Sequence, residues 1–293
     1  MDRTEAGTSA FLRGHAQRTP ERATPVISLR GAALAYGDRA LWSGLDMEVR
    51  PGEFLAVLGP NGSGKTSLLR VILGRQQLTA GSVTVLGRVP RRGSRQIGYI
   101  PQQEALPAHS MPRVRDLVQL GIDGHRWGPS LTPRAIRRRV DEVLASVGAT
   151  HLADIPVGRL SGGERQRVRV AQALATDPRI LLCDEPLLSL DLRYQRTVIE
   201  LVDRRRRGAG TAVVFVTHEI NPVLGPLDRV LYLAPGGFLI GAPDEVMTTP
   251  TLSQLYGTRI DVVRVGGRIV VVGAPDADTV HSHADDPSAG GQP

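Results

Sequence analysis

Cysteine is almost absent from this 293-residue sequence. The single Cys183 excludes an intramolecular disulfide, which is typical of proteins in a reducing compartment. The chain also lacks any run of about 18–20 apolar residues, the length that a membrane-spanning helix requires. Its first 24 residues lack the apolar segment of a secretory signal. We therefore expect a soluble, cytoplasmic chain without a transmembrane segment.

Lysine is the second scarce residue, since Lys65 is the only lysine among 36 Lys plus Arg side chains. Arginine serves equally well on a solvated surface, so this one lysine indicates a place that needs a compact ammonium. Aromatic residues are only 4% of the chain, which leaves few platforms for stacking nucleic-acid bases. The formal charge is nevertheless +7, with arginine clusters at 91–95, 137–139 and 204–207. We interpret these clusters as solvated faces or contacts with a charged partner, and we expect no nucleic acid.

The hydrophobic pattern predicts one domain at residues 25–274, between segments of disordered composition at 1–24 and 275–293. Residues 26–49 are typical of short strands broken by turns. After residue 50, expected strands and helices alternate, which favours a mainly parallel sheet with helices on both faces. The expected strands are 51–60, 81–87, 95–100, 179–184 and 211–218, with hairpins at 229–242 and 259–274. The expected helices are 65–74, 114–120, 133–149, 149–154, 162–176 and 192–207, and an inserted helical lobe is expected at about 103–160.

Two motifs predict a nucleoside triphosphate site. GPNGSGKT at 59–66 fits the phosphate-loop pattern, in which backbone amides surround the phosphates, Lys65 reaches the β and γ phosphates, and Thr66 holds Mg²⁺. RILLCDEP at 179–186 is a buried strand that ends in Asp184, a candidate Mg²⁺ ligand. Glu185 follows it and is a candidate to orient or deprotonate the attacking water. The two motifs together indicate ATP hydrolysis.

A third motif, LSGGERQR at 160–167, places glycines and Ser161 before a helix, which makes a second anion-binding loop. With the first two motifs it resembles the ATP-binding cassette (ABC) ATPases, and the resemblance extends from about Val26 to Gly241. It implies a P-loop NTPase fold of ABC type, with an N-terminal antiparallel β subdomain and the helical lobe. It also implies ATP and Mg²⁺ as ligands. Glu164 stands where the family often has glutamine.

The resemblance assigns roles residue by residue. Tyr36 matches the aromatic residue that stacks on adenine, although an isolated strand tyrosine would be read as structural. Gln102 matches the glutamine that senses Mg²⁺ and the attacking water. His218 matches the histidine that contacts the γ phosphate, although a lone histidine after a strand is more often structural. The expected nucleotide-binding residues are Tyr36, Gly59, Pro60, Asn61, Gly62, Ser63, Gly64, Lys65, Thr66 and Ser67. The expected loop toward the ATP of a partner subunit is Leu160, Ser161, Gly162, Gly163 and Glu164, and the expected dimer loop is Ser189, Leu190 and Asp191, with serine in place of the commoner alanine.

In that family two cassettes pack head to tail, so the resemblance implies an ATP-bound homodimer that works on separate membrane permeases from the cytoplasmic face. Segments 114–128, 217–247 and 251–273 look most like ATPases of zinc and manganese importers, with iron-complex importers next. An extracytoplasmic solute-binding protein would act indirectly. A soluble cassette acting on ribosomes or DNA is the rival hypothesis, but the chain has one motif set and no long insertion.

The HSHADD segment at 281–286 could bind a divalent cation through His281, His283, Asp285 and Asp286, although we favour a solvated tail. Equal heats of zinc titration with and without the tail would end that idea. His125 is expected to belong to the permease-facing lobe.

Overall fold

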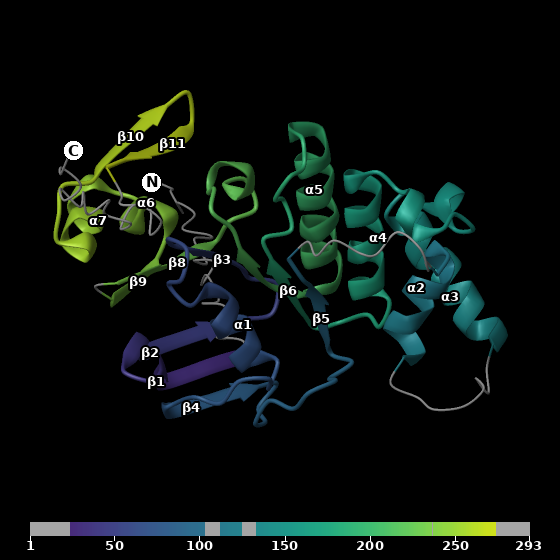
Figure 1. Ribbon diagram of the computed structural model, residues 1–293, viewed down its shortest axis with the longest axis horizontal. Coiled ribbons are helices and arrows are strands. Elements are labelled where there is room, and N and C mark those ends of the chain that lie inside the picture. The colour runs from purple at the N-terminus through teal and green to yellow at the C-terminus, as the bar shows by residue number, and fades with distance from the viewer. Residues whose placement is uncertain (1–23, 103–111, 125–132, 236, 274–293) are drawn as a thin grey trace, which may run out of the picture.

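The computed structural model describes residues 24–102, 112–124, 133–235 and 237–273. Six strands form its central sheet, seen near the middle of Figure 1. They are β3 (Phe54–Leu58), β5 (Ile97–Ile100), β6 (Ile180–Asp184), β7 (Ala212–Val216), β8 (Arg229–Ala234) and β9 (Gly237–Gly241). The order is β5-β6-β7-β3-β8-β9, and only β9 pairs antiparallel. The expected mainly parallel sheet is confirmed.

A separate antiparallel sheet forms the N-terminal subdomain. It contains β1 (Ile27–Tyr36), β2 (Arg39–Val49) and β4 (Ala80–Val85), in the order β2-β1-β4. Residues 26–49 therefore form two long strands rather than several short ones. Gly31 and Gly44 have positive φ angles of 51° and 68°, and the register between β1 and β2 shifts near them. The glycines and turn residues thus mark bulges within strands rather than strand ends.

Seven α-helices accompany these sheets among the described residues. They are α1 (Lys65–Ile72), α2 (Val114–Asp123), α3 (Pro133–Ser146), α4 (Gly162–Leu174), α5 (Leu192–Ala209), α6 (Pro243–Val246) and α7 (Thr249–Tyr256). Single 3-10 turns occupy Thr150–Leu152, Val157–Arg159 and Asn221–Val223. The helix expected at 149–154 is thus only a 3-10 turn, and neither α6 nor α7 was expected. The limits predicted for the helical lobe, 103–160, stay a prediction, since 103–111 and 125–132 lie outside the described residues.

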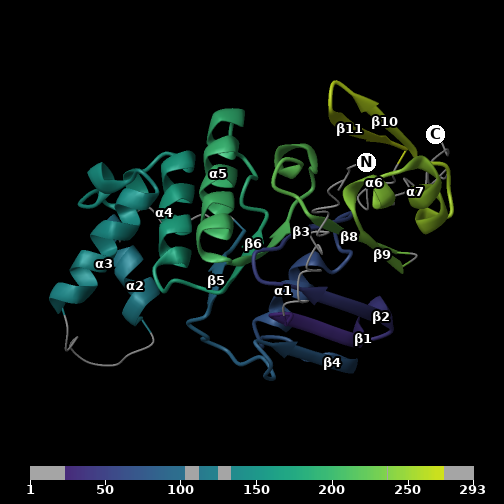
Figure 2. The ribbon, with the colours of Figure 1, turned by 180° about the vertical axis from the view of Figure 1, so that it is seen from behind.

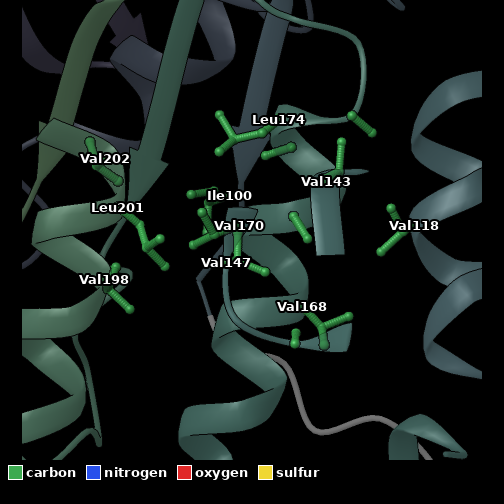
Figure 3. Packing of buried hydrophobic residues seen from close by; sticks show 14 of the residues in the cluster. Ile100, Val118, Val143, Val147, Val168, Val170, Leu174, Val198, Leu201 and Val202 are labelled. Atoms are coloured by element: carbon green, nitrogen blue, oxygen red, sulfur yellow. The ribbon is translucent and has the colours of Figure 1, made fainter. Parts of the chain in front are cut away.

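The two faces of the central sheet are covered differently. Phe54 and Ala56 of β3 belong to a core shared with α2 to α5, whose packed valines and leucines Figure 3 shows. Leu55 and Val57, on the opposite face, join a core with α1 and the antiparallel sheet. This alternation follows the two-residue period of a strand. Helices on both faces were expected, but on the second face α1 shares the covering with β1 and β2.

A third core joins the C-terminal elements to strand β8 of the central sheet. Two further strands, β10 (Asp261–Val265) and β11 (Arg268–Val272), form an antiparallel ribbon that turns at Gly266 and Gly267. Ile260 and Ile269 pack with β8, α6 and α7. The ribbon and helices α2 and α3 lie at opposite ends of the molecule in both views (Figures 1 and 2). Both terminal segments predicted to be disordered lie outside the described residues, apart from Thr24.

Within the described ranges, none of the helices combines the length and the apolar character needed to cross a membrane.

Candidate functional site

Four loops lie together at the carboxyl-terminal ends of the parallel strands of the central sheet. They follow β3, β5, β6 and β7, whose carboxyl ends point the same way because these strands pair in parallel. Open parallel sheets bind ligands at these strand ends. The loops carry residues 59–66, Gln102, the Asp184–Glu185 pair and His218. Motifs far apart in the sequence are therefore brought to one place.

The phosphate loop depends on glycine for its shape. Gly59, Gly62 and Gly64 have φ angles of 139°, 74° and 95°, which other residues rarely adopt. A Cβ on Gly59 would lie only 2.0 Å from the carbonyl oxygen of Leu233 in β8. The loop leads directly into α1, whose first N–H groups and dipole favour a bound anion.

Lys65 is buried at the first turn of α1, with 5% of its surface exposed. Its Nζ donates hydrogen bonds to the carbonyl oxygens of Gly59 and Pro60, at 2.7 and 2.9 Å. Burial lowers the pKa of Lys65, and the carboxylates of Glu185 and Asp184 oppose this shift. The ammonium is thus held in a site where a further negative group would stabilise its charge.

Asp184 is the last residue of β6 and is 1% exposed. Its Oδ1 accepts a hydrogen bond from Thr66 Oγ1 at 3.1 Å, and its Oδ2 accepts one from the Tyr99 hydroxyl at 3.2 Å. Burial raises the pKa of Asp184, and these two hydrogen bonds oppose the rise. Burial and the Asp184 charge raise the pKa of Tyr99 to about 12, so this hydroxyl remains a donor.

Glu185 lies at the centre of a small polar network. Gln102 Nε2 donates to Glu185 Oε2 at 3.1 Å, and His218 Nε2 lies 2.6 Å from Glu185 Oε1. The backbone of Glu185 has a φ of 50° and its N–H bonds to the Val216 carbonyl at 3.0 Å. Glu185 and His218 also line a cavity of about 150 Å³. The structure therefore brings together the three residues predicted to be catalytic.

The LSGGE loop forms the N-terminus of α4 as a capping box. The Ser161 hydroxyl accepts a hydrogen bond from the Glu164 N–H at 3.3 Å, and Glu164 Oε2 accepts from the Ser161 N–H at 2.9 Å. The Ser161 N–H and the Ser161 hydroxyl, which also donates to Glu164 Oε2 at 2.8 Å, lower the pKa of Glu164. Ser161 and Gly162 are exposed. No hydrogen bond or ion pair between described residues joins this loop to residues 59–66, so the two anion loops of one chain are separate.

The comparisons with known proteins agree with this site. The model of the ABC transporter family matches residues 42–188, which include the phosphate loop, the LSGGE loop and Glu185. This chain belongs to the ABC transporter family. It is an ABC ATPase that binds ATP, and the predicted family, fold and enzymatic activity are confirmed.

Individual relatives differ in the cargo that their names state. This ABC ATPase is 36% identical over 237 residues to a zinc import ATP-binding protein ZnuC of Halorhodospira halophila, covering 80% of this chain and 85% of the relative. It is 35% identical over 250 residues to a sulfate/thiosulfate import ATP-binding protein CysA of Methylococcus capsulatus, covering 83% and 70%. A metal-chelate type ABC transporter solved in an inward-facing conformation matches with a TM-score of 0.72 and 27% identity, covering 85% of this chain and 96% of that chain.

Two further predicted groups of this ABC ATPase lie at the surface. Tyr36, at the end of β1, is 47% exposed, and its hydroxyl lies 3.4 Å from Ser67 Oγ in α1. Ser189 is exposed with a φ of 61°, and Asp191 caps α5 by accepting from the Tyr194 N–H at 2.9 Å. Leu190 between them is buried. Tyr36, Ser189 and Asp191 are therefore accessible to other molecules, whereas Leu190 is not.

The sequence did not identify three side chains that shape this site. Tyr99 bonds to Asp184, as described above. Arg39 NH2 donates to the Gly62 carbonyl at 3.3 Å. The indole of Trp42 is buried against the phosphate loop, with Nε1 2.8 Å from where a Cβ on Gly64 would lie. Tyr99 precedes Gln102 by three positions, which was the one available signal.

The suggested metal-binding tail and the histidine expected in the permease-facing lobe both lie outside the described residues. These are His125 and the HSHADD segment at 281–286. Within the described ranges, no cluster of three or more His, Cys, Asp or Glu side chains is arranged to hold a metal ion.

Proposed function

We propose that this ABC ATPase hydrolyses ATP to energise import of a divalent metal ion, zinc or manganese, through a separate membrane permease. The observation that carries the hydrolytic part is the contact of Glu185 with both Gln102 and His218 beside the phosphate loop. Several relatives whose names state zinc import support zinc as the cargo. The metal-chelate neighbour favours an iron-complex importer as the alternative.

The phosphate loop and Lys65 would bind the triphosphate. Residues Gly59, Pro60, Asn61, Gly62, Ser63 and Gly64 supply the backbone of the loop, and Thr66 and Ser67 continue it into α1. Ser63 supports this role, because its Oγ is buried with no hydrogen-bond partner among the described residues. A buried hydroxyl of this kind is costly unless a ligand pairs with it. Tyr36, exposed at the end of β1 with its hydroxyl 3.4 Å from Ser67 Oγ, would stack on the adenine.

The Thr66 hydroxyl and the Asp184 carboxylate fit a magnesium ion. Both are hard oxygen ligands and lie 3.1 Å apart, Thr66 in the first turn of α1 and Asp184 at the end of β6. The raised pKa of buried Asp184 also indicates that a cation would be stabilising there. Gln102 would complete this set from β5. The ion would neutralise charge on the β and γ phosphates when bound.

Glu185 would act as the base that accepts a proton from the attacking water. His218 and Gln102 hold its two carboxylate oxygens at 2.6 and 3.1 Å, which fixes the direction of the side chain. The positive φ of Glu185 is a further sign of a residue held in place, because such backbone conformations cost energy. His218 would in addition contact the γ phosphate.

A second copy of this chain would complete each ATP site. Ser161 and Gly162 are exposed at the N-terminus of α4, and no hydrogen bond or ion pair between described residues joins them to the phosphate loop of their own chain. A head-to-tail homodimer would place the loop at 160–164 over the partner's ATP, with Ser189, Leu190 and Asp191 at the contact. The permease would dock from the membrane, so that the dimer works at its cytoplasmic face. A solute-binding protein would deliver the metal to the permease.

Substitution Glu185→Gln tests this assignment. The amide keeps the shape of the side chain but cannot accept the proton, so we expect turnover to fall by about 100-fold or more and ATP to remain bound in a dimer. Steady-state hydrolysis and size-exclusion chromatography with light scattering would measure both effects. Glu219→Gln, one residue after His218, is the matched control. Wild-type turnover by the Glu185→Gln variant would refute the role of Glu185.

A further inference from the structure

A large cavity lies away from the nucleotide site. It has a volume of about 800 Å³ and is formed mainly by the connection between β4 and β5, residues 85–97. Five arginines line it: Arg88, Arg91, Arg92, Arg95 and Arg179. No acidic or aromatic side chain is among its described lining residues. We call it the five-arginine cavity.

None of these five arginines forms an ion pair with a described residue, whereas others such as Arg139 and Arg205 do. The nearest acidic residue in sequence to Arg179 is Asp177, which is held by Arg139 at 2.7 Å and Arg205 at 3.0 Å. Five uncompensated charges of one sign around one hollow repel each other, and an anion in the hollow would relieve this repulsion.

The backbone that carries the arginines is fixed. The Gln96 carbonyl accepts hydrogen bonds from the N–H groups of Arg179 and Ile180, at 2.9 and 3.1 Å. At the other end, Val85 and Arg88 exchange backbone hydrogen bonds of 2.7 and 3.1 Å. In the middle of this connection, Pro90 packs closely on Gly74. A Cβ added to Gly74 would lie 2.8 Å from the Pro90 carbonyl oxygen. The arginines thus project from a scaffold attached at three points.

The cavity and the nucleotide site lie at opposite ends of strands β5 and β6. Gln96 and Arg179 precede β5 and β6, whereas Gln102 and Asp184 lie at the carboxyl ends of these strands. A strand of this length separates its ends by roughly 15 Å. The five-arginine cavity is therefore not an extension of the ATP site.

We propose that the five-arginine cavity binds an anion that carries two or more phosphate groups. Planar guanidinium groups bind phosphate oxygens in pairs, and five exposed arginines line this one cavity without a carboxylate among its lining residues. The volume is in the usual range for small-ligand sites. The lack of aromatic residues in the lining disfavours nucleic acid, since bases would have nothing to stack on. A soluble oligophosphate and a diphosphorylated lipid headgroup share the required chemistry, and Val89, 73% exposed at the cavity, would suit a lipid surface.

The test uses the full chain without nucleotide, because ADP is itself a diphosphate and would compete for the cavity, and without magnesium, because pyrophosphate binds Mg²⁺. Pyrophosphate bound at the phosphate loop would remain in both variants, so the binding that only the cavity variant loses reports the cavity. Pyrophosphate is titrated by calorimetry, and flotation measures binding to phosphatidylcholine vesicles with or without cardiolipin. The cavity variant combines Arg91→Gln, Arg92→Gln and Arg95→Gln. The control variant combines Arg134→Gln, Arg137→Gln and Arg138→Gln, which removes the same charge from the exposed side of α3.

We expect wild type to bind at least one probe, and we expect the cavity variant to bind it at least about tenfold more weakly, as loss of charge-assisted hydrogen bonds requires. The control variant should bind as wild type does. Binding of pyrophosphate alone would identify a soluble ligand, and binding of cardiolipin vesicles alone would identify a headgroup. Binding of neither probe, unchanged binding by the cavity variant, or an equal loss in both variants would overturn the proposal. Unchanged ATP hydrolysis by the cavity variant would show that the nucleotide site is intact.

Discussion

Substitution Lys65→Arg gives the most informative perturbation of the ATP site. Lys65 is 5% exposed, and its Nζ makes hydrogen bonds of 2.7 and 2.9 Å to two carbonyl oxygens of its own loop. A guanidinium has five N–H donors in a rigid plane, in place of three rotatable donors on one atom. Because the side chain is enclosed, the extra donors cannot reach water, and each unpaired donor costs about 1–3 kcal/mol.

The cost to catalysis follows from the same geometry. Arginine at this position keeps the positive charge, but its N–H donors do not lie where the lysine Nζ lies. The variant therefore loses one charge-assisted contact to the transition state. Removing one such contact typically lowers kcat by about 100- to 1000-fold. We therefore expect Lys65→Arg to lower kcat for ATP hydrolysis by at least about 100-fold, although the formal charge of the protein is unchanged.

A coupled assay of phosphate release at saturating ATP would measure this loss. Arg137→Lys, the reverse exchange at an exposed position of α3, is the matched control and should keep wild-type turnover. Retention by Lys65→Arg of more than about a tenth of wild-type kcat, a loss of less than 1.4 kcal/mol, would contradict the reasoning. It would mean that the loop accepts either cation and that the scarcity of lysine reflects composition alone.

Three further substitutions test other parts of the structure. Tyr99→Phe removes a hydrogen bond that orients Asp184, and should raise the magnesium concentration that gives half-maximal hydrolysis. Asp184→Asn should abolish hydrolysis yet raise the melting temperature at pH 7 without nucleotide and magnesium, by about 2–4 °C for each kcal/mol gained. The pKa of Asp184 is raised in the folded state, so this side chain stabilises the fold at pH values below its unfolded-state pKa. That contribution is lost as the pH rises through the folded-state pKa, whereas the amide of asparagine stays neutral at every pH. Gly163→Ala should lower the melting temperature, because its Cβ would lie 2.5 Å from the Tyr194 ring.

Each of these has a control. Tyr36→Phe is a tyrosine exchange away from Asp184 and should leave the magnesium requirement unchanged. Glu200→Gln removes a charge at an exposed position of α5 and should not change the melting temperature. Gly162→Ala introduces the same methyl group into open space. Equal behaviour of a variant and its control would contradict the corresponding interpretation.

The central sheet could be predicted because its strands are uniformly apolar. β6 and β7 are buried on both faces, so their sequences, ILLCD and AVVFV, are apolar throughout except for the terminal Asp184. The extent of β1 and β2 could not be predicted in the same way. Gly31 and Gly44 are turn formers in sequence, but here they lie in bulges, and the pairing of β1 with β2 continues on both sides of each bulge. The helix α7 was missed because it has only eight residues and few apolar ones.

The motif residues of the site could be predicted because the phosphate loop and its strand and helix are local in sequence. Contacts that arise from strand pairing could not. Tyr99 reaches Asp184 because β5 and β6 pair in parallel, with Ile100 opposite Cys183. Arg39 and Trp42 reach the phosphate loop because the antiparallel sheet packs over α1. No spacing in the sequence indicates either neighbour.

Uptake of radioactive zinc tests the central claim most directly. A strain of the source organism that lacks this gene would be complemented with the wild-type chain or with Glu185→Gln, at equal expression, and compared for zinc, manganese and sulfate uptake. The account predicts that the wild-type chain restores uptake of zinc or manganese, with zinc favoured, and that Glu185→Gln restores none. Restored metal uptake with Glu185→Gln, or restored sulfate uptake alone with the wild-type chain, would contradict it.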